Sequence, residues 1–133
     1  MKQSLKKIAI AALILSSVGC KKISTPNEES KRLFGSWRYD LSIGGYSGVG
    51  GSNRFSADSW VEFTEKGFFK TYAGSKKKDQ KRFKLEMKKS IYDVNERPAL
   101  VYRSGYETFQ ISNDTLYLSD EAYDGYTYRF IRK

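Results

Sequence analysis

The chain has 133 residues, of which 24 are lysine or arginine and 15 are aspartate or glutamate, so its formal net charge is +9. It contains no histidine and a single cysteine, which excludes a Ser-His-Asp triad, a histidine-containing metal site and an internal disulfide. Its length fits one domain that buries most of its apolar surface on folding.

The first 19 residues have the pattern of a secretory signal peptide. Lys2, Lys6 and Lys7 form a positively charged start, and an unbroken apolar run follows from Ile8 to Leu15. This run is too short to span a bilayer, which needs about 20 apolar residues. We therefore predict that residues 1–19 are a signal peptide that is removed from the mature protein.

The segment that ends at Cys20 resembles the lipobox of bacterial lipoproteins. The small residue Gly19 precedes the cysteine, while Ser17 stands where the lipobox usually has leucine. The resemblance implies that Cys20 is acylated, becomes the first mature residue and anchors the protein in a membrane. The alternative is an ordinary signal peptide that ends in a cysteine by chance. Cleavage removes three lysines and no acidic residue, which lowers the net charge from +9 to +6.

The residues after Cys20 predict where the protein resides. Lys21 and Lys22 follow the cysteine, and the absence of aspartate at position 21 resembles lipoproteins that are passed on to the outer membrane. Ile23 to Lys31 shows neither helical nor strand periodicity and is predicted to be a polar tether. We expect residues 20–32 to hold the domain off the bilayer in the cell envelope.

From residue 33 onward the pattern predicts short strands and no long helix. Residues 37–43 alternate between apolar and polar side chains, which is typical of a strand with one buried face. The glycine-rich loop Gly44–Gly51 follows and lacks the lysine and the serine or threonine of a P-loop. About eight strands joined by hairpins predict an all-β fold, an antiparallel up-and-down β-barrel. The further strands are expected over residues 59–64, 68–72, 83–88 with 91–94, 100–103, 108–112, 116–118 and 126–131, with hairpin turns at 65–67 and across 73–80 and a break at 95–98.

Gly35-Ser36-Trp37 on the first predicted strand looks like the Gly-x-Trp motif of lipocalins. The last strand carries basic residues where lipocalins often place one against that tryptophan. Residues 33–133 are similar to the lipocalin-like domains of small bacterial lipoproteins, although the wider lipocalin motifs are missing and a ligand pocket is not implied by the motif alone. The residues that carry the similarity, besides the triplet, are Arg129, Arg132, Lys133, the segment Ile111–Leu118 and the tyrosine-rich ending Tyr123–Tyr128.

A barrel of this size is either filled by its side chains or keeps room for one small ligand. In a filled barrel Trp37 plugs the closed end, which we favour over a ligand contact for this residue. In a hollow barrel, strand aromatics hold a lipophilic or amphipathic molecule and Gly44–Gly51 covers the mouth. The ligand-binding candidates are Trp37, Trp60, Phe63, Phe83, Tyr102, Tyr126 and Tyr128.

A run of basic residues in the middle of the chain predicts an electropositive surface. Such a surface attracts anionic lipid, lipopolysaccharide or acidic protein in the envelope, and export makes nucleic acid the wrong partner. The alternative is a solvated edge that protects a strand from aggregation. The predicted basic patch consists of Lys76, Lys77, Lys78, Lys81, Arg82 and Lys84.

Asp120, Glu121 and Asp124 are the acidic residues that come closest to a catalytic or calcium-binding pattern. Their spacing does not match the EF-hand loop, and a solvated turn explains them. We therefore expect no enzyme activity, no cofactor and no metal.

Two classes of function stay open at this point. The first, which the resemblance favours, is a membrane-anchored carrier or sensor of a small lipophilic or amphipathic molecule. The second is a closed-core interaction module, inhibitory or scaffolding, that uses its basic edge on an envelope partner. We expect a monomer in both cases. A cavity of a few hundred cubic ångströms inside the barrel would distinguish the first class from the second.

Overall fold

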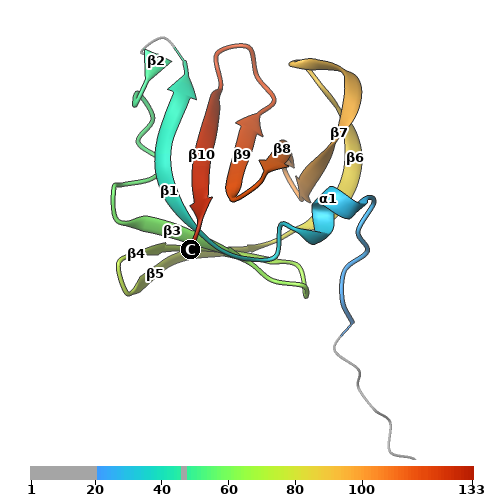
Figure 1. The fold of residues 1–133 in the computed structure, drawn as a ribbon, viewed down its shortest axis with the longest axis horizontal. Helices are drawn as coiled ribbons and strands as arrows, with labels where there is room; N and C mark the ends of the chain where they lie inside the picture. The colour runs from blue at the N-terminus through green and yellow to red at the C-terminus, as the bar shows by residue number, and fades with distance from the viewer. Residues whose placement is uncertain (1–20, 46–47) are drawn as a thin grey trace, which may run out of the picture.

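The computed structural model describes residues 21–45 and 48–133, so the predicted signal peptide and Cys20 lie outside the described residues. The described chain forms one antiparallel sheet that curls into a half-barrel, with the short helix α1 (Glu28–Lys31) beside it (Figure 1). Within the described ranges, no helix is long and apolar enough to cross a membrane.

The sheet is a meander in which strands that are neighbours in sequence mostly pair with each other. The order across the sheet is β5-β4-β3-β1-β10-β9-β8-β7-β6, and β2 pairs with β1 off this path. The pairing of β1 with β10 joins the beginning of the domain to its end. The strands are β1 (Gly35–Gly44), β2 (Gly48–Val49), β3 (Ser59–Phe63), β4 (Phe68–Ala73), β5 (Lys76–Arg82), β6 (Lys84–Ser90), β7 (Asp93–Tyr102), β8 (Gly105–Ser112), β9 (Thr115–Asp120) and β10 (Tyr126–Arg132).

The prediction of an antiparallel β fold is confirmed, but the predicted number of about eight strands in a closed barrel is wrong. Nine strands lie on the path, and among the described strands the pairing ends at β5 on one side and β6 on the other. Phe83 alone separates these two strands in sequence. The sheet therefore curls until its two edges approach at Phe83, and it stays a half-barrel because they do not pair beyond this residue.

Two parts of the chain became strands without a period-two signal. β5 has the sequence KKKDQKR, which looks like part of a turn because it lacks alternating apolar residues, yet it pairs along its length with β4. β7 runs through the expected break at 95–98. Pro98 is tolerated there because the pairing of β7 with β8 begins only at Ala99, so no neighbour on that side needs a proline N–H.

The interior of the half-barrel is filled with aromatic rings. Phe63 lies 4.6 Å from Phe69 and 5.9 Å from Phe83 between ring centroids. Phe55, from the loop between β2 and β3, lies 5.2 Å from both Phe130 and Tyr128. Such pairs add to the burial of apolar surface that stabilises a core. The buried cluster consists of Leu33, Trp37, Tyr39, Phe55, Val61, Phe63, Phe69, Phe83, Leu85, Leu100, Phe109, Ile111, Leu116, Leu118, Tyr128 and Phe130.

The segment expected to be an irregular tether is held on the sheet and contains the helical turn α1. The Asn27 side chain caps α1 by accepting a hydrogen bond from the Ser30 amide at 2.9 Å, and Ser30 is fully buried. The Glu29 carboxylate accepts a hydrogen bond from the Ile111 amide of β8 at 2.7 Å. These contacts run from side chain to backbone, so they leave no periodic pattern in the sequence.

Candidate functional site

Six of the seven predicted ligand-binding aromatics belong to the core or pack against it, and the seventh lies on the outer face. Trp37, Phe63, Phe83 and Tyr128 are core residues, and Tyr102 and Tyr126 pack against them half-buried. Trp60 alternates with the buried residues of β3 and points outward, where its ring stacks on Tyr72 at 3.9 Å and the Lys133 ammonium lies 3.7 Å from its centroid. The structure therefore does not bring all seven around one space.

Trp37 belongs to the buried core of the half-barrel. Its side chain is fully buried, and its Nε1 donates a hydrogen bond to the Leu33 carbonyl at 2.7 Å. The Arg132 guanidinium lies 3.7 Å from the indole and donates hydrogen bonds to the carbonyls of Phe34 and Arg32 at 3.0 and 2.6 Å. The expected contact between this tryptophan and a basic residue of the last strand is thus present.

A partly buried ion pair, which the sequence pattern did not indicate, occupies the concave side of the sheet. The loop between β2 and β3 turns the Arg54 side chain inward, where it donates two hydrogen bonds to the Glu107 carboxylate at 2.6 and 2.9 Å. The Tyr102 hydroxyl donates to the same carboxylate at 2.9 Å, and Asp120 lies 3.7 Å from Arg54. This bidentate geometry satisfies the charged groups that the fold removes from water.

The pKa shifts around this ion pair follow from burial and from the Glu107 charge. Burial lowers the pKa of the Arg54 guanidinium, but hydrogen bonding to Glu107 and its charge outweigh burial and raise the pKa overall. Burial, followed by the Glu107 charge, raises the pKa of the Tyr102 hydroxyl well above its usual value. Both groups therefore keep their protons at neutral pH and can donate their hydrogen bonds to the Glu107 carboxylate.

Lys81 is the half-buried cation beside this cluster. Its ammonium lies 4.0 Å from the centroid of the Tyr102 ring and 5.3 Å from that of Phe69, and burial lowers its pKa. No ion pair of the described residues includes Lys81. A hollow of about 350 Å³ opens next to it, lined by Arg54, Lys81, Tyr102, Ser104, Gly105, Tyr106, Glu107 and Asp120.

The structure divides the predicted basic patch into three parts. Residues 76–78 are exposed along the first half of β5, whereas Lys81 pairs in register with the buried Phe69 and therefore points inward. Arg82 and Lys84 are exposed on either side of Phe83, at the corner between β5 and β6. The patch is thus an edge strand and a corner, not one compact surface.

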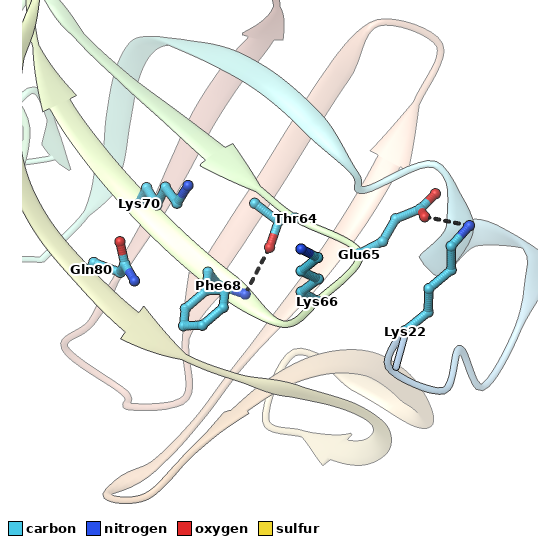
Figure 2. Close-up of a pocket in the computed structure, with 7 residues that line it drawn as sticks. All are labelled: Lys22, Thr64, Glu65, Lys66, Phe68, Lys70 and Gln80. Atoms are coloured by element: carbon cyan, nitrogen blue, oxygen red, sulfur yellow. Dashed lines mark hydrogen bonds and ion pairs between the residues drawn. The ribbon is translucent and has the colours of Figure 1, made fainter. Parts of the chain in front are cut away.

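A second basic group, here called the basic end, surrounds the turn between β3 and β4. Figure 2 shows one side of it, a hollow of about 470 Å³ in which Lys22 reaches Glu65 at 2.7 Å while Lys66 lies on the turn between them and Phe68. Two adjoining hollows of about 480 Å³ each connect this turn with the corner at Phe83 and with the N-terminal segment. The cations that line these hollows, and define the basic end, are Lys21, Lys22, Lys66, Lys70, Arg82, Lys84 and Arg103.

The acidic residues near the end of β9 accept hydrogen bonds from neighbouring segments of the chain. Glu121 accepts hydrogen bonds from the Ser90 hydroxyl at 3.0 Å, from the Ile91 amide at 2.9 Å and from the Thr108 hydroxyl. Asp120 accepts from the Tyr126 amide at 3.1 Å, and burial raises its pKa. Among residues 21–45 and 48–133 no group of three or more potential metal ligands occurs.

Comparison of the chain with protein-family models, with curated proteins and with solved structures finds no match. Three features of the molecule bear on its function: the packed interior, the exposed basic edge strand β5 and the basic end. Each of them is defined by described residues.

Proposed function

We propose that this protein is a lipid-anchored protein of the bacterial cell envelope, attached through Cys20 at the outer membrane. Its lipocalin-like half-barrel serves as an interaction module whose β5 edge binds an acidic segment of an envelope protein. The packed aromatic interior favours such a module over a carrier of a lipophilic cargo, because the rings of Phe63, Phe69 and Phe83 already occupy the space that a cargo needs.

The observation that carries this proposal is the free edge of β5. In the part of the chain that the structure describes, β5 pairs with β4 alone, which leaves the amide and carbonyl groups of its other edge to solvent. Five of its seven residues are lysine or arginine, and all except Lys81 are exposed. A free edge accepts an added strand through backbone hydrogen bonds.

The charge on β5 selects what kind of strand can add to this edge. Two copies of β5 repel each other, which protects the protein from edge-to-edge association and fits a monomer. An acidic strand is attracted to this edge, because its carboxylates face the lysines of β5 across the new strand pair. The edge is thus closed to self-association and open to a partner of opposite charge.

Site-specific photocrosslinking in the living cell tests the proposal. A photoreactive side chain at Lys77 on β5 should give a defined protein adduct, and one at the fully exposed Val94 on β7 should not. The change Lys76→Glu with Lys78→Glu should abolish the adduct, while Lys31→Glu with Lys89→Glu, an equal change in charge at exposed sites elsewhere, should preserve it. Equal adducts at both positions, or an adduct that survives the first pair of changes, would refute the proposal.

A second candidate function rests on Lys81. A half-buried ammonium without a carboxylate in an ion pair, beside a hollow of about 350 Å³, fits the anionic group of a small amphipathic molecule. Native mass spectrometry of protein extracted from its membrane should then show a defined adduct that Lys81→Gln loses and Lys76→Gln retains. An unmodified mass for both proteins would rule out this candidate.

A further inference from the structure

The chain is fixed to the half-barrel almost immediately after Cys20. Lys22 forms an ion pair with Glu65 at 2.7 Å, and the Ile23 amide donates a hydrogen bond to the Glu65 carbonyl at 2.8 Å. Ile23 packs against the core. It also lies directly on Gly67 of the turn between β3 and β4, where a Cβ added to the glycine would be 2.8 Å from the Ile23 Cγ2 atom. Only Lys21 lies between position 20 and these contacts, and one extended residue spans at most about 3.6 Å. An anchor at position 20 therefore also holds the turn between β3 and β4 close to the bilayer.

The end of the half-barrel held in this way is strongly basic. Seven cations line its hollows, against the two carboxylates Glu65 and Glu86. Two of these cations are already paired, Lys22 with Glu65 and Lys70 with Glu62. No ion pair of the described residues includes Lys66, Lys84 or Arg103, and all three side chains are exposed. Lys66 and Arg103 are far from the N-terminal lysines in sequence, so this concentration of charge is produced by the fold.

We propose that the basic end is a membrane-facing surface that binds the headgroups of anionic phospholipids and thereby fixes the orientation of the half-barrel on the bilayer. Clusters of four to eight lysines or arginines next to an anchor bind anionic lipid surfaces, and each cation adds to the attraction. An acyl anchor alone permits the domain to tumble about its attachment point. With the basic end against the headgroups, the domain has one preferred face toward the membrane.

This inference uses the proposed anchor at Cys20 only to place the surface near a bilayer, so the two can fail separately. Protein purified from its membrane is reconstituted on vesicles of phosphatidylcholine alone and on vesicles that contain 30% phosphatidylglycerol. Attachment to the neutral vesicles reports the lipid anchor. If the protein attaches to the anionic vesicles but not to the neutral ones, the lipid anchor is contradicted. The orientation of the protein on the anionic vesicles can still be measured as described next.

Lysine acetylation read by mass spectrometry measures the orientation. Lys66 and Lys84 should react about fivefold more slowly on the anionic vesicles than on the neutral ones, which is the effect expected for a lysine at an anionic surface. Lys76, Lys77 and Lys78 should react equally on both. Sodium chloride at 0.5 M should abolish the difference by screening. Equal labelling of Lys66 and Lys84 on the two kinds of vesicle, or equal protection of residues 76–78, would overturn the proposal.

Matched variants separate this specific surface from general attraction of a basic protein. In Lys66→Gln with Lys84→Gln, the protection of Lys21 by anionic lipid should disappear; in Lys76→Gln with Lys78→Gln, which removes the same charge, it should remain. All four substituted residues are exposed, so both variants should keep the unfolding midpoint of the native protein. The same loss of protection in both variants would show attraction by net charge and contradict an oriented surface.

Discussion

The ion pair between Arg54 and Glu107 gives the sharpest stability prediction. Removing Glu107 leaves a guanidinium on the concave side of the sheet with its principal partner gone. The Glu107 side chain is 10% exposed and that of Arg54 27% exposed, so water can compensate the guanidinium only in part. We therefore expect Glu107→Ala to cost much more than the loss of an ordinary surface charge, which is about 0–1 kcal/mol.

The magnitude follows from what the carboxylate binds. Glu107→Ala deletes the two hydrogen bonds from Arg54 and the one from Tyr102, and leaves Arg54 with Asp120 at 3.7 Å. Removing one partner of a buried pair typically costs about 3–5 kcal/mol. Because Asp120 and the residual exposure of Arg54 both offset part of the loss, we expect about 3 kcal/mol for Glu107→Ala.

The assay is urea unfolding followed by tryptophan fluorescence, with a double-mutant cycle. Arg54→Ala combined with Glu107→Ala should cost less than the sum of the single changes, with a coupling energy between about 1 and 3 kcal/mol, because the double variant contains no orphaned charge. Two results would refute the reasoning: a cost below about 1 kcal/mol for Glu107→Ala, or strict additivity of the two changes.

Three further predictions test the core, the half-buried Lys81 and the proposed anchor. Trp37→Ala should lower the free energy of unfolding by about 3–5 kcal/mol, and Trp60→Ala, which loses an outer stacking pair, by about 1 kcal/mol; urea unfolding checks both. Burial lowers the pKa of Lys81 in the folded protein below 10.5, its usual value and that of the unfolded chain. Between the folded-state pKa and 10.5, the unfolded chain binds this proton more readily than the folded chain does. The free energy of unfolding of the native protein, relative to that of Lys81→Met, should therefore rise with pH through this range. Finally, the intact mass of the native membrane-extracted protein should correspond to a chain that begins at an acylated Cys20, and Cys20→Ala should carry no acyl mass; an unacylated native protein would contradict the anchor.

The strands that the sequence predicts are those with one apolar face. β1, β3 and β4 place Trp37, Val61 and Phe69 inward at period two, and their positions follow from that alternation. The sequence does not predict β5, because β5 is a strand through its backbone pairing with β4 and its side chains show no apolar alternation. β7 escapes because Pro98 looks like a breaker until the pairing shows that one of its sides is free there.

The candidate sites also differ in how far the sequence predicts them. Residues 76–78 are neighbours in sequence, so a basic edge is visible without a structure. Arg54 and Glu107 are 53 positions apart and belong to a loop and a strand with no shared motif, so only the curl of the sheet brings them together. Lys66 meets the N-terminal lysines because Ile23 pairs with the turn at Glu65, a contact that no local pattern indicates.

The two proposals place different partners at the two ends of β5, and Phe83 marks the end proposed to face the membrane. Its amide donates a hydrogen bond to the Gly67 carbonyl at 2.9 Å and its ring is buried, so the corner between β5 and β6 is fixed to the turn of the basic end. Six residue steps separate Arg82 at this corner from Lys76 at the far end of β5, a distance of about 20 Å along an extended strand. Charges interact over about 8 Å at physiological ionic strength. A bilayer against the corner would therefore leave the charge at Lys76 free of lipid. The proposed acidic strand could then pair with the far half of β5 while the near half faced the membrane.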